Sequence, residues 1–147
     1  MKRELIDYWV KKDQLRKRSL DREKILSMIE TAKINMSIVK TVPLTENSAV
    51  LIFRETYESL RQLGDARWWL LGYEPRNHEV SMDALKDMDI TERTLLQHLS
   101  RFKAIRNDIN YRGFKATVAQ AQEIIGFWNA CAEEIMNTHL TELKQKR

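Results

Sequence analysis

Residues 47–71 read NSAVLIFRETYESLRQLGDARWWLL, and this stretch decides the fold class. Its apolar residues recur every three or four positions, the spacing that places side chains on one face of an α-helix. The stripe comprises Val50, Phe53, Tyr57, Leu60, Gly64, Trp68 and Leu71. Gly64 falls on this stripe, where the missing side chain predicts a packing notch that lets a neighbouring helix approach closely.

Two further amphipathic helices are expected on either side of this one. Residues 21–42 show the same spacing, and their helix must end near Pro43 because proline lacks an amide donor. A helix capped by Asp89 or Thr91 is expected to continue to Gly113, which suits a left-handed C-terminal residue.

The last predicted helix begins at a capping box formed by Thr117 and Gln120 and runs to about Leu143. Together, the four helices and their short connections predict an all-α fold, an up-and-down antiparallel four-helix bundle. The weakly periodic residues 1–20 predict a basic N-terminal extension with a short helix outside the bundle.

Length and composition favour one domain over residues 1–147, with its core at about 21–143. A single cysteine and three histidines provide neither a disulfide nor a zinc ligand set, so we expect no metal and no cofactor. The charged N-terminus and the absence of a long apolar run indicate a cytoplasmic protein without a membrane partner.

Four other side chains have structural interpretations. Cys131 lies on an apolar face and is expected to be an inert small hydrophobe. His139 lies near the end of the last helix, where a partly positive imidazole would complement the helix dipole. Because Trp68 and Trp69 are consecutive, we expect one to face the core and the other to cover a two-fold interface between two copies of the chain.

Arg106 is the ionisable residue that stands out, because it falls inside the apolar stripe of the 89–113 helix. A guanidinium directed toward a core needs a carboxylate partner, a bound anion or a site open to solvent at the rim of the bundle. The two interpretations are an ion pair with Glu55, Glu58 or Asp108 at the rim, and a ligand-facing role.

The segment around Arg106, RFKAIRNDINYRGFK over residues 101–115, mixes basic, amide and aromatic side chains. Arginine and lysine neutralise phosphates, amides contact base edges or sugars, and aromatic rings stack on bases. This mixture suits RNA or a nucleotide. The candidate ligand-binding residues are Arg101, Arg106, Asn107, Asn110, Tyr111 and Arg112, of which Arg106 and Tyr111 are also the catalytic candidates.

Residues 54–85, with the 101–128 segment that carries Arg106-Asn107, resemble the HEPN superfamily (higher eukaryotes and prokaryotes nucleotide-binding), in an archaeal-type variant. The likeness covers roughly residues 21–143. It implies a helical bundle that dimerises and places the arginine signature in the dimer cleft. Many members of the superfamily are metal-independent ribonucleases, or toxins paired with a nucleotidyltransferase antitoxin.

Ribonuclease members carry a histidine where this chain has Tyr111. Tyrosine, with a pKa of about 10, is poorly suited to proton transfer near neutral pH, so binding without cleavage is favoured. The leading hypothesis is a homodimer that holds RNA or a nucleotide phosphate at Arg106. The alternatives are a non-catalytic helical module that pairs with a nucleotidyltransferase, and an active ribonuclease whose histidine is His78 or His98.

Overall fold

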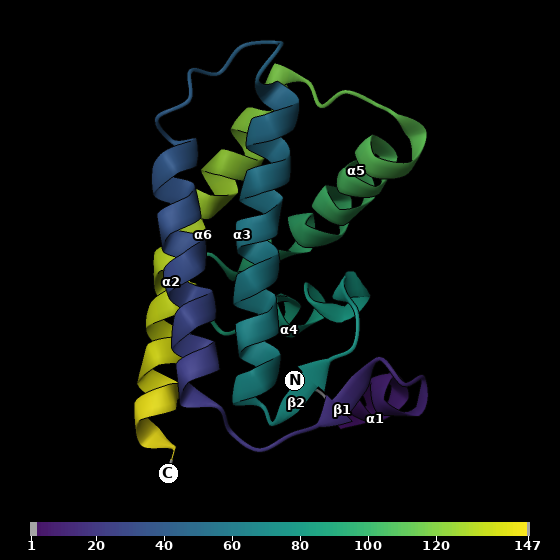
Figure 1. The fold of residues 1–147 in the computed structure, drawn as a ribbon, viewed down its shortest axis with the longest axis vertical. Coiled ribbons are helices and arrows are strands. Elements are labelled where there is room, and N and C mark those ends of the chain that lie inside the picture. The colour runs from purple at the N-terminus through teal and green to yellow at the C-terminus, as the bar shows by residue number, and fades with distance from the viewer. Residues whose placement is uncertain (1–2, 147) are drawn as a thin grey trace.

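The computed structural model describes residues 3–146 and is mostly helical, which confirms the predicted class in its coarse form (Figure 1). The three longest helices, α2 (Arg22–Val39), α3 (Ala49–Leu70) and α6 (Val118–Gln145), lie side by side. Helix α5 (Leu99–Arg112) is inclined against α3, which contacts α2, α5 and α6 and forms the centre of the fold. Within the described range, no helix is both long and apolar enough to cross a membrane.

Several helix ends follow from local chemistry. Asp21 caps α2 by accepting a hydrogen bond from the backbone N–H of Lys24 at 3.0 Å. Gly113 ends α5 in the left-handed conformation, with φ of 71°. Thr117 and Gln120 exchange both hydrogen bonds of the capping box that starts α6. These ends confirm the start of α6 and the end of α5.

The N-terminal segment differs from the prediction of a single short helix. Helix α1 (Arg3–Lys11) is followed by the strand β1 (Leu15–Lys17), which pairs antiparallel with β2 (Tyr73–Pro75). Leu15 faces Pro75 in this register and is buried. The strand depends on a partner almost 60 residues away, and hydrophobic periodicity within residues 1–20 carries no information about such pairing.

The connection between β2 and α5 also differs from the prediction of a continuous helix after Asp89. It contains the 3₁₀-helix η1 (His78–Val80), the short helix α4 (Asp83–Lys86) and a second 3₁₀-helix, η2 (Arg93–His98). Thr91 does not cap a helix here. Its backbone N–H and hydroxyl instead donate to the carboxylate of Glu134 on α6.

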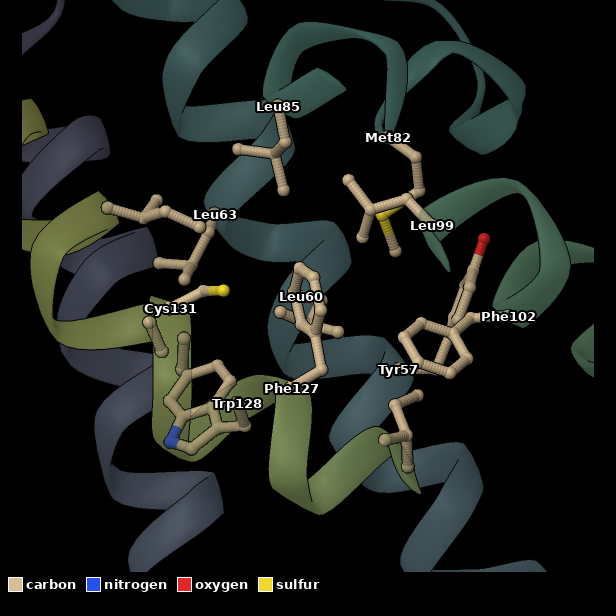
Figure 2. Packing of buried hydrophobic residues seen from close by; sticks show 14 of the residues in the cluster. Tyr57, Leu60, Leu63, Met82, Leu85, Leu99, Phe102, Phe127, Trp128 and Cys131 are labelled. Atoms are coloured by element: carbon tan, nitrogen blue, oxygen red, sulfur yellow. The ribbon is translucent and has the colours of Figure 1, made fainter. Parts of the chain in front are cut away.

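The core consists of a large cluster among α2, α3, α5 and α6, part of which is shown in Figure 2, and a smaller cluster that includes Ile6 of α1. Trp69 belongs to the large cluster and Trp68 to the small one, and both are buried within one chain. The expectation that one of the two covers an interface between copies is therefore wrong. Because consecutive helical residues point about 100° apart, two clusters on different sides of α3 accommodate both tryptophans within one chain.

Candidate functional site

Arg106 lies on the side of α5 that faces α3. Its side chain is partly buried, and its guanidinium carbon lies 5.4 Å from the centroid of the Tyr57 ring. One terminal nitrogen, Nη1, donates a 3.0 Å hydrogen bond to Oδ1 of Asn107. Tyr57 belongs to the apolar stripe of α3 and sits beside Phe102 at the α5 edge of the core (Figure 2). Because the π-face of an aromatic ring attracts cations, Tyr57 fixes the guanidinium at the rim.

Arg106 has no carboxylate partner among the described residues. Three arginines in residues 3–146 are buried or partly buried, namely Arg61, Arg67 and Arg106. Arg61 and Arg67 each form ion pairs with carboxylates. No carboxylate oxygen in the described chain lies within 4.0 Å of Arg106, so the rim ion pair with Glu55, Glu58 or Asp108 is not formed. Arg106 therefore retains its capacity to bind an anion.

A network of charged side chains on α3 lies next to Arg106. Nε of Arg61 donates to Oε2 of Glu58 at 2.8 Å, and its Nη1 donates to Oδ2 of Asp65 at 2.5 Å. Burial opposes ionisation of Glu58, but its hydrogen bonds and charge contact with Arg61 lower its pKa overall. The nearby positive charges of His78 and Arg106 act in the same direction on the pKa of Glu58.

Tyr57 stays neutral beneath this network. Burial raises the pKa of its hydroxyl to about 12, although the nearby positive charge of Arg106 opposes the shift. A phenol with this pKa neither gives up nor takes a proton near neutral pH. Tyr57 therefore serves as a platform for Arg106 and not as an acid or base.

The 3₁₀-helix η1 brings His78 to the same network. Nδ1 of His78 lies 2.6 Å from Nη1 of Arg61 and 3.6 Å from Oδ2 of Asp65. A guanidinium has donors and no acceptor, so Nδ1 accepts this hydrogen bond and the ring proton resides on Nε2. The hydroxyl of Ser81 donates to Oδ1 of Asp65 at 2.5 Å. Both oxygens of the buried Asp65 are thus occupied.

Close packing against α3 fixes the position of η1. A Cβ atom at Gly64 would overlap the backbone carbonyl of Ser81, so the predicted packing notch is confirmed, although it admits a loop and not a helix. The indole N–H of Trp68 donates to the carbonyl of Val80 at 2.7 Å. On the α5 side, Nζ of Lys103 donates to the carbonyl of Glu79 at 2.8 Å and pairs with its carboxylate at 2.9 Å.

The six candidate residues from the sequence do not all share one face of α5. Arg101 pairs with Glu123 on α6, and Arg112 pairs with Asp108 at 3.8 Å. Neither contacts the Tyr57 platform. Asn107 lies directly beside Arg106. The exposed Asn110 and Tyr111 lie on the last turn of α5, where the Tyr111 side chain is 76% exposed.

The three histidines occupy different environments. Nδ1 of His98 lies 4.0 Å from the carboxylate of Glu123, on the α6 side of α5. His139 is fully buried, and its Nε2 donates to the carbonyl of Leu63 at 2.9 Å. Burial lowers the pKa of His139 to about 4, so the expected positive imidazole at the helix end is wrong. His78 is the histidine that joins the Arg61 network.

Sequence reasoning did not assign Arg61, Asp65 and Ser81 to the site. The sequence does contain a signal for part of this charged network. Glu58, Arg61 and Asp65 are spaced three and four residues apart and therefore share one face of α3. That face borders the apolar stripe and has to be partly buried. The position of Ser81 depends on the fold of residues 76–82, which the local sequence pattern does not reveal.

Comparison of the chain with protein-family models, with curated proteins and with solved structures finds no match. The function proposed below therefore depends on the geometry of the site and on the sequence resemblance.

Proposed function

We propose that this chain is a HEPN-like domain that binds RNA or a nucleotide through a phosphate held by Arg106. In this proposal α2, α3, α5 and α6 are the four helices of the bundle. The observation that carries it is the partly buried Arg106 guanidinium, which rests on Tyr57 and has no ion pair in the described chain. A planar guanidinium binds phosphate through two parallel hydrogen bonds, and an arginine held in place loses little side-chain entropy on binding.

The charges around Arg106 favour the binding of a single phosphate group over contacts with many phosphates along a strand. Three cations face three carboxylates in this cluster: Arg61, Lys103 and Arg106 against Glu58, Asp65 and Glu79. Arg61 and Lys103 are engaged by these carboxylates, which leaves Arg106 as the open cation. Asn107 and the exposed Asn110 provide amides that orient a sugar or base next to the phosphate.

Binding of labelled single-stranded RNA and of nucleoside phosphates tests this function. Arg106→Ala should weaken binding by about 1.5–3 kcal/mol, roughly ten- to a hundredfold, through loss of charge-assisted hydrogen bonds. Arg106→Lys keeps the charge without the planar pair of donors and should fall in between. Arg16→Ala, which removes an exposed positive charge on β1, is the matched control. Equal affinities for wild type and Arg106→Ala would refute the proposal.

His78 supports a second candidate function, a metal-independent ribonuclease. Its ring is held by Arg61 close to Asp65, and its side chain is 57% exposed, so Nε2 is accessible. An imidazole transfers protons near neutral pH, whereas the phenol of a tyrosine is poorly suited to do so. RNA incubated without metal should stay intact under the binding proposal. Cleavage by the wild type that disappears in both His78→Ala and Arg106→Ala would establish the nuclease instead.

The remaining partner assignments come from the resemblance and stay predictions. They are a toxin–antitoxin context and pairing with a nucleotidyltransferase, in which the 101–115 segment serves as a protein interface. A small nucleotidyltransferase that co-purifies with the wild-type chain and is lost in a Tyr111→Ala, Phe114→Ala variant would favour that alternative, since both aromatic side chains are exposed.

A further inference from the structure

The donors that Arg106 has left match the two free oxygens of a phosphodiester. Its guanidinium rests on the Tyr57 ring, and its Nη1 already donates to Asn107. A guanidinium carries five N–H donors in one plane, so a pair of parallel donors remains for a ligand. A phosphodiester has two non-bridging oxygens and one negative charge, whereas a terminal phosphate has three such oxygens and up to two charges. The third oxygen of a terminal phosphate needs a further donor.

The two neighbouring cations are not free to supply that donor. Arg61 is bonded to Glu58 and to Asp65 on its own helix. Lys103, one turn before Arg106 on α5, is bonded to the carbonyl and the carboxylate of Glu79. Either cation would have to give up an ion pair in order to reach a ligand.

The charged network on α3 also carries a surplus negative charge. Arg61 is a single cation that faces two carboxylates, Glu58 and Asp65. The Asp65 side chain is 8% exposed and lies about two helical turns beyond Tyr57. Glu58 follows Tyr57 directly, and its side chain is 42% exposed. Glu58 is therefore the carboxylate of this network that lies nearest to an anion held on the Tyr57 platform.

This charge arrangement opposes a doubly charged ligand more strongly than a singly charged one. The attraction between an anion and a cation grows in proportion to the charge of the anion. The cost of removing the anion from water grows with the square of its charge, and Arg106 holds its ligand at a partly buried position. The charge of Glu58 reduces the attraction without reducing this cost. One open arginine beside Glu58 therefore compensates one negative charge better than two.

We propose that the Arg106 site selects a phosphodiester over a terminal phosphate, and that Glu58 is the residue that sets this selectivity. The inference rests on the proposed function, because it requires that Arg106 holds a phosphate. Glu58 acts through its charge and not through contact with the ligand. A phosphate inside an RNA strand meets the requirement, whereas a free nucleotide or a phosphorylated strand end does not.

Two ligands that differ by one methyl group test the selectivity. Adenosine 5′-monophosphate and its methyl ester are titrated into the chain and followed by NMR. At pH 8 the monophosphate carries two negative charges, since its second pKa is about 6, and the methyl ester carries one. The wild type should bind the methyl ester at least about threefold more tightly. A monophosphate that binds as tightly as its methyl ester, or more tightly, would overturn the proposal.

Glu58→Gln tests whether this residue sets the selectivity. Glutamine keeps the shape of the side chain and an oxygen that accepts from Arg61, but it removes the charge. A change in electrostatic potential acts on each unit of ligand charge, so a threefold gain for the methyl ester should become about a ninefold gain for the monophosphate. Glu30→Gln, at an exposed carboxylate of α2, is the matched control and should leave the ratio of the two affinities unchanged.

The same titrations separate the failure of this inference from the failure of the proposed function. If Arg106→Ala weakens both ligands but Glu58→Gln leaves their affinity ratio as in the wild type, the phosphate is at Arg106 and the role of Glu58 is refuted. If Arg106→Ala binds both ligands like the wild type, or if the wild type binds neither, both proposals fail. Circular dichroism confirms that each variant keeps its fold.

Discussion

The guanidinium carbon of Arg106 lies 5.4 Å from the centroid of the Tyr57 ring, so a cation from α5 rests on an aromatic side chain from α3. This contact explains how a charged residue occupies the apolar stripe of α5 without a carboxylate. It also links the fold to the proposed function, because the packing of α5 on α3 sets the position of the phosphate-binding group.

Replacing Tyr57 tests the platform directly. Tyr57→Leu removes the π-face but keeps an apolar side chain, so Arg106 loses a cation–π contact of about 0.5–2 kcal/mol. We expect RNA affinity to fall roughly two- to thirtyfold by fluorescence anisotropy. Tyr57→Phe retains the ring and should bind like the wild type. Equal binding by Tyr57→Leu and Tyr57→Phe would show that the ring does not position the arginine.

Two helical glycines should respond to alanine in opposite ways. Gly64→Ala adds a methyl group that overlaps the backbone of Ser81, and the resulting overpacking should lower the free energy of unfolding by about 1–3 kcal/mol. Gly126 in α6 has open space at its Cβ position, so Gly126→Ala should raise stability by up to about 1 kcal/mol through helix propensity. Urea unfolding of both variants measures the contrast, and a stabilised Gly64→Ala would contradict the close packing of η1.

His139 should make the fold sensitive to acid. Its pKa is 6.5 when unfolded and about 4 when buried, so between these values the unfolded chain binds a proton that the folded chain does not. The unfolded state is then favoured, and the free energy of unfolding falls as the pH decreases from 6.5 toward 4.

His139→Gln isolates this contribution, because glutamine can donate to the Leu63 carbonyl without titrating. The stability difference between wild type and His139→Gln should shift in favour of the variant as the pH falls from 7 to about 4. Urea unfolding at several pH values measures it. A difference that is constant with pH would mean that His139 titrates alike in both states.

The sequence predicts those parts of the fold that depend on neighbours along the chain. The end of α2 before Pro43, the left-handed Gly113 and the Thr117–Gln120 capping box all have local causes, and all are confirmed. The pairing of β1 with β2 depends on residues far apart in the chain. The 3₁₀ geometry of Arg93–His98 accompanies the bond from Thr91 to Glu134. Local periodicity reveals neither.

In the candidate site, too, the sequence predicts the features with local causes and not those that depend on how separate elements pack. The position of Arg106 on an apolar stripe is readable from helical spacing, and the structure places it at the rim of the core. Its contact with Tyr57 instead of Glu58 depends on how α5 is rotated against α3. The ion pairs of Arg101 with Glu123 and of Lys103 with Glu79 likewise join separate elements. Composition therefore does not reveal how many basic side chains of this segment lack a carboxylate partner.

The salt dependence of RNA affinity tests the central proposal most directly. Each phosphate contact on a single strand contributes a slope of about −0.7 to log K against log salt concentration. With Arg106 as the open cation of the site, the wild type should show a shallow slope close to that of one contact. Arg106→Ala should lose about one contact from the slope along with at least tenfold in affinity. An Arg106→Ala variant with wild-type affinity and slope would contradict phosphate binding by Arg106.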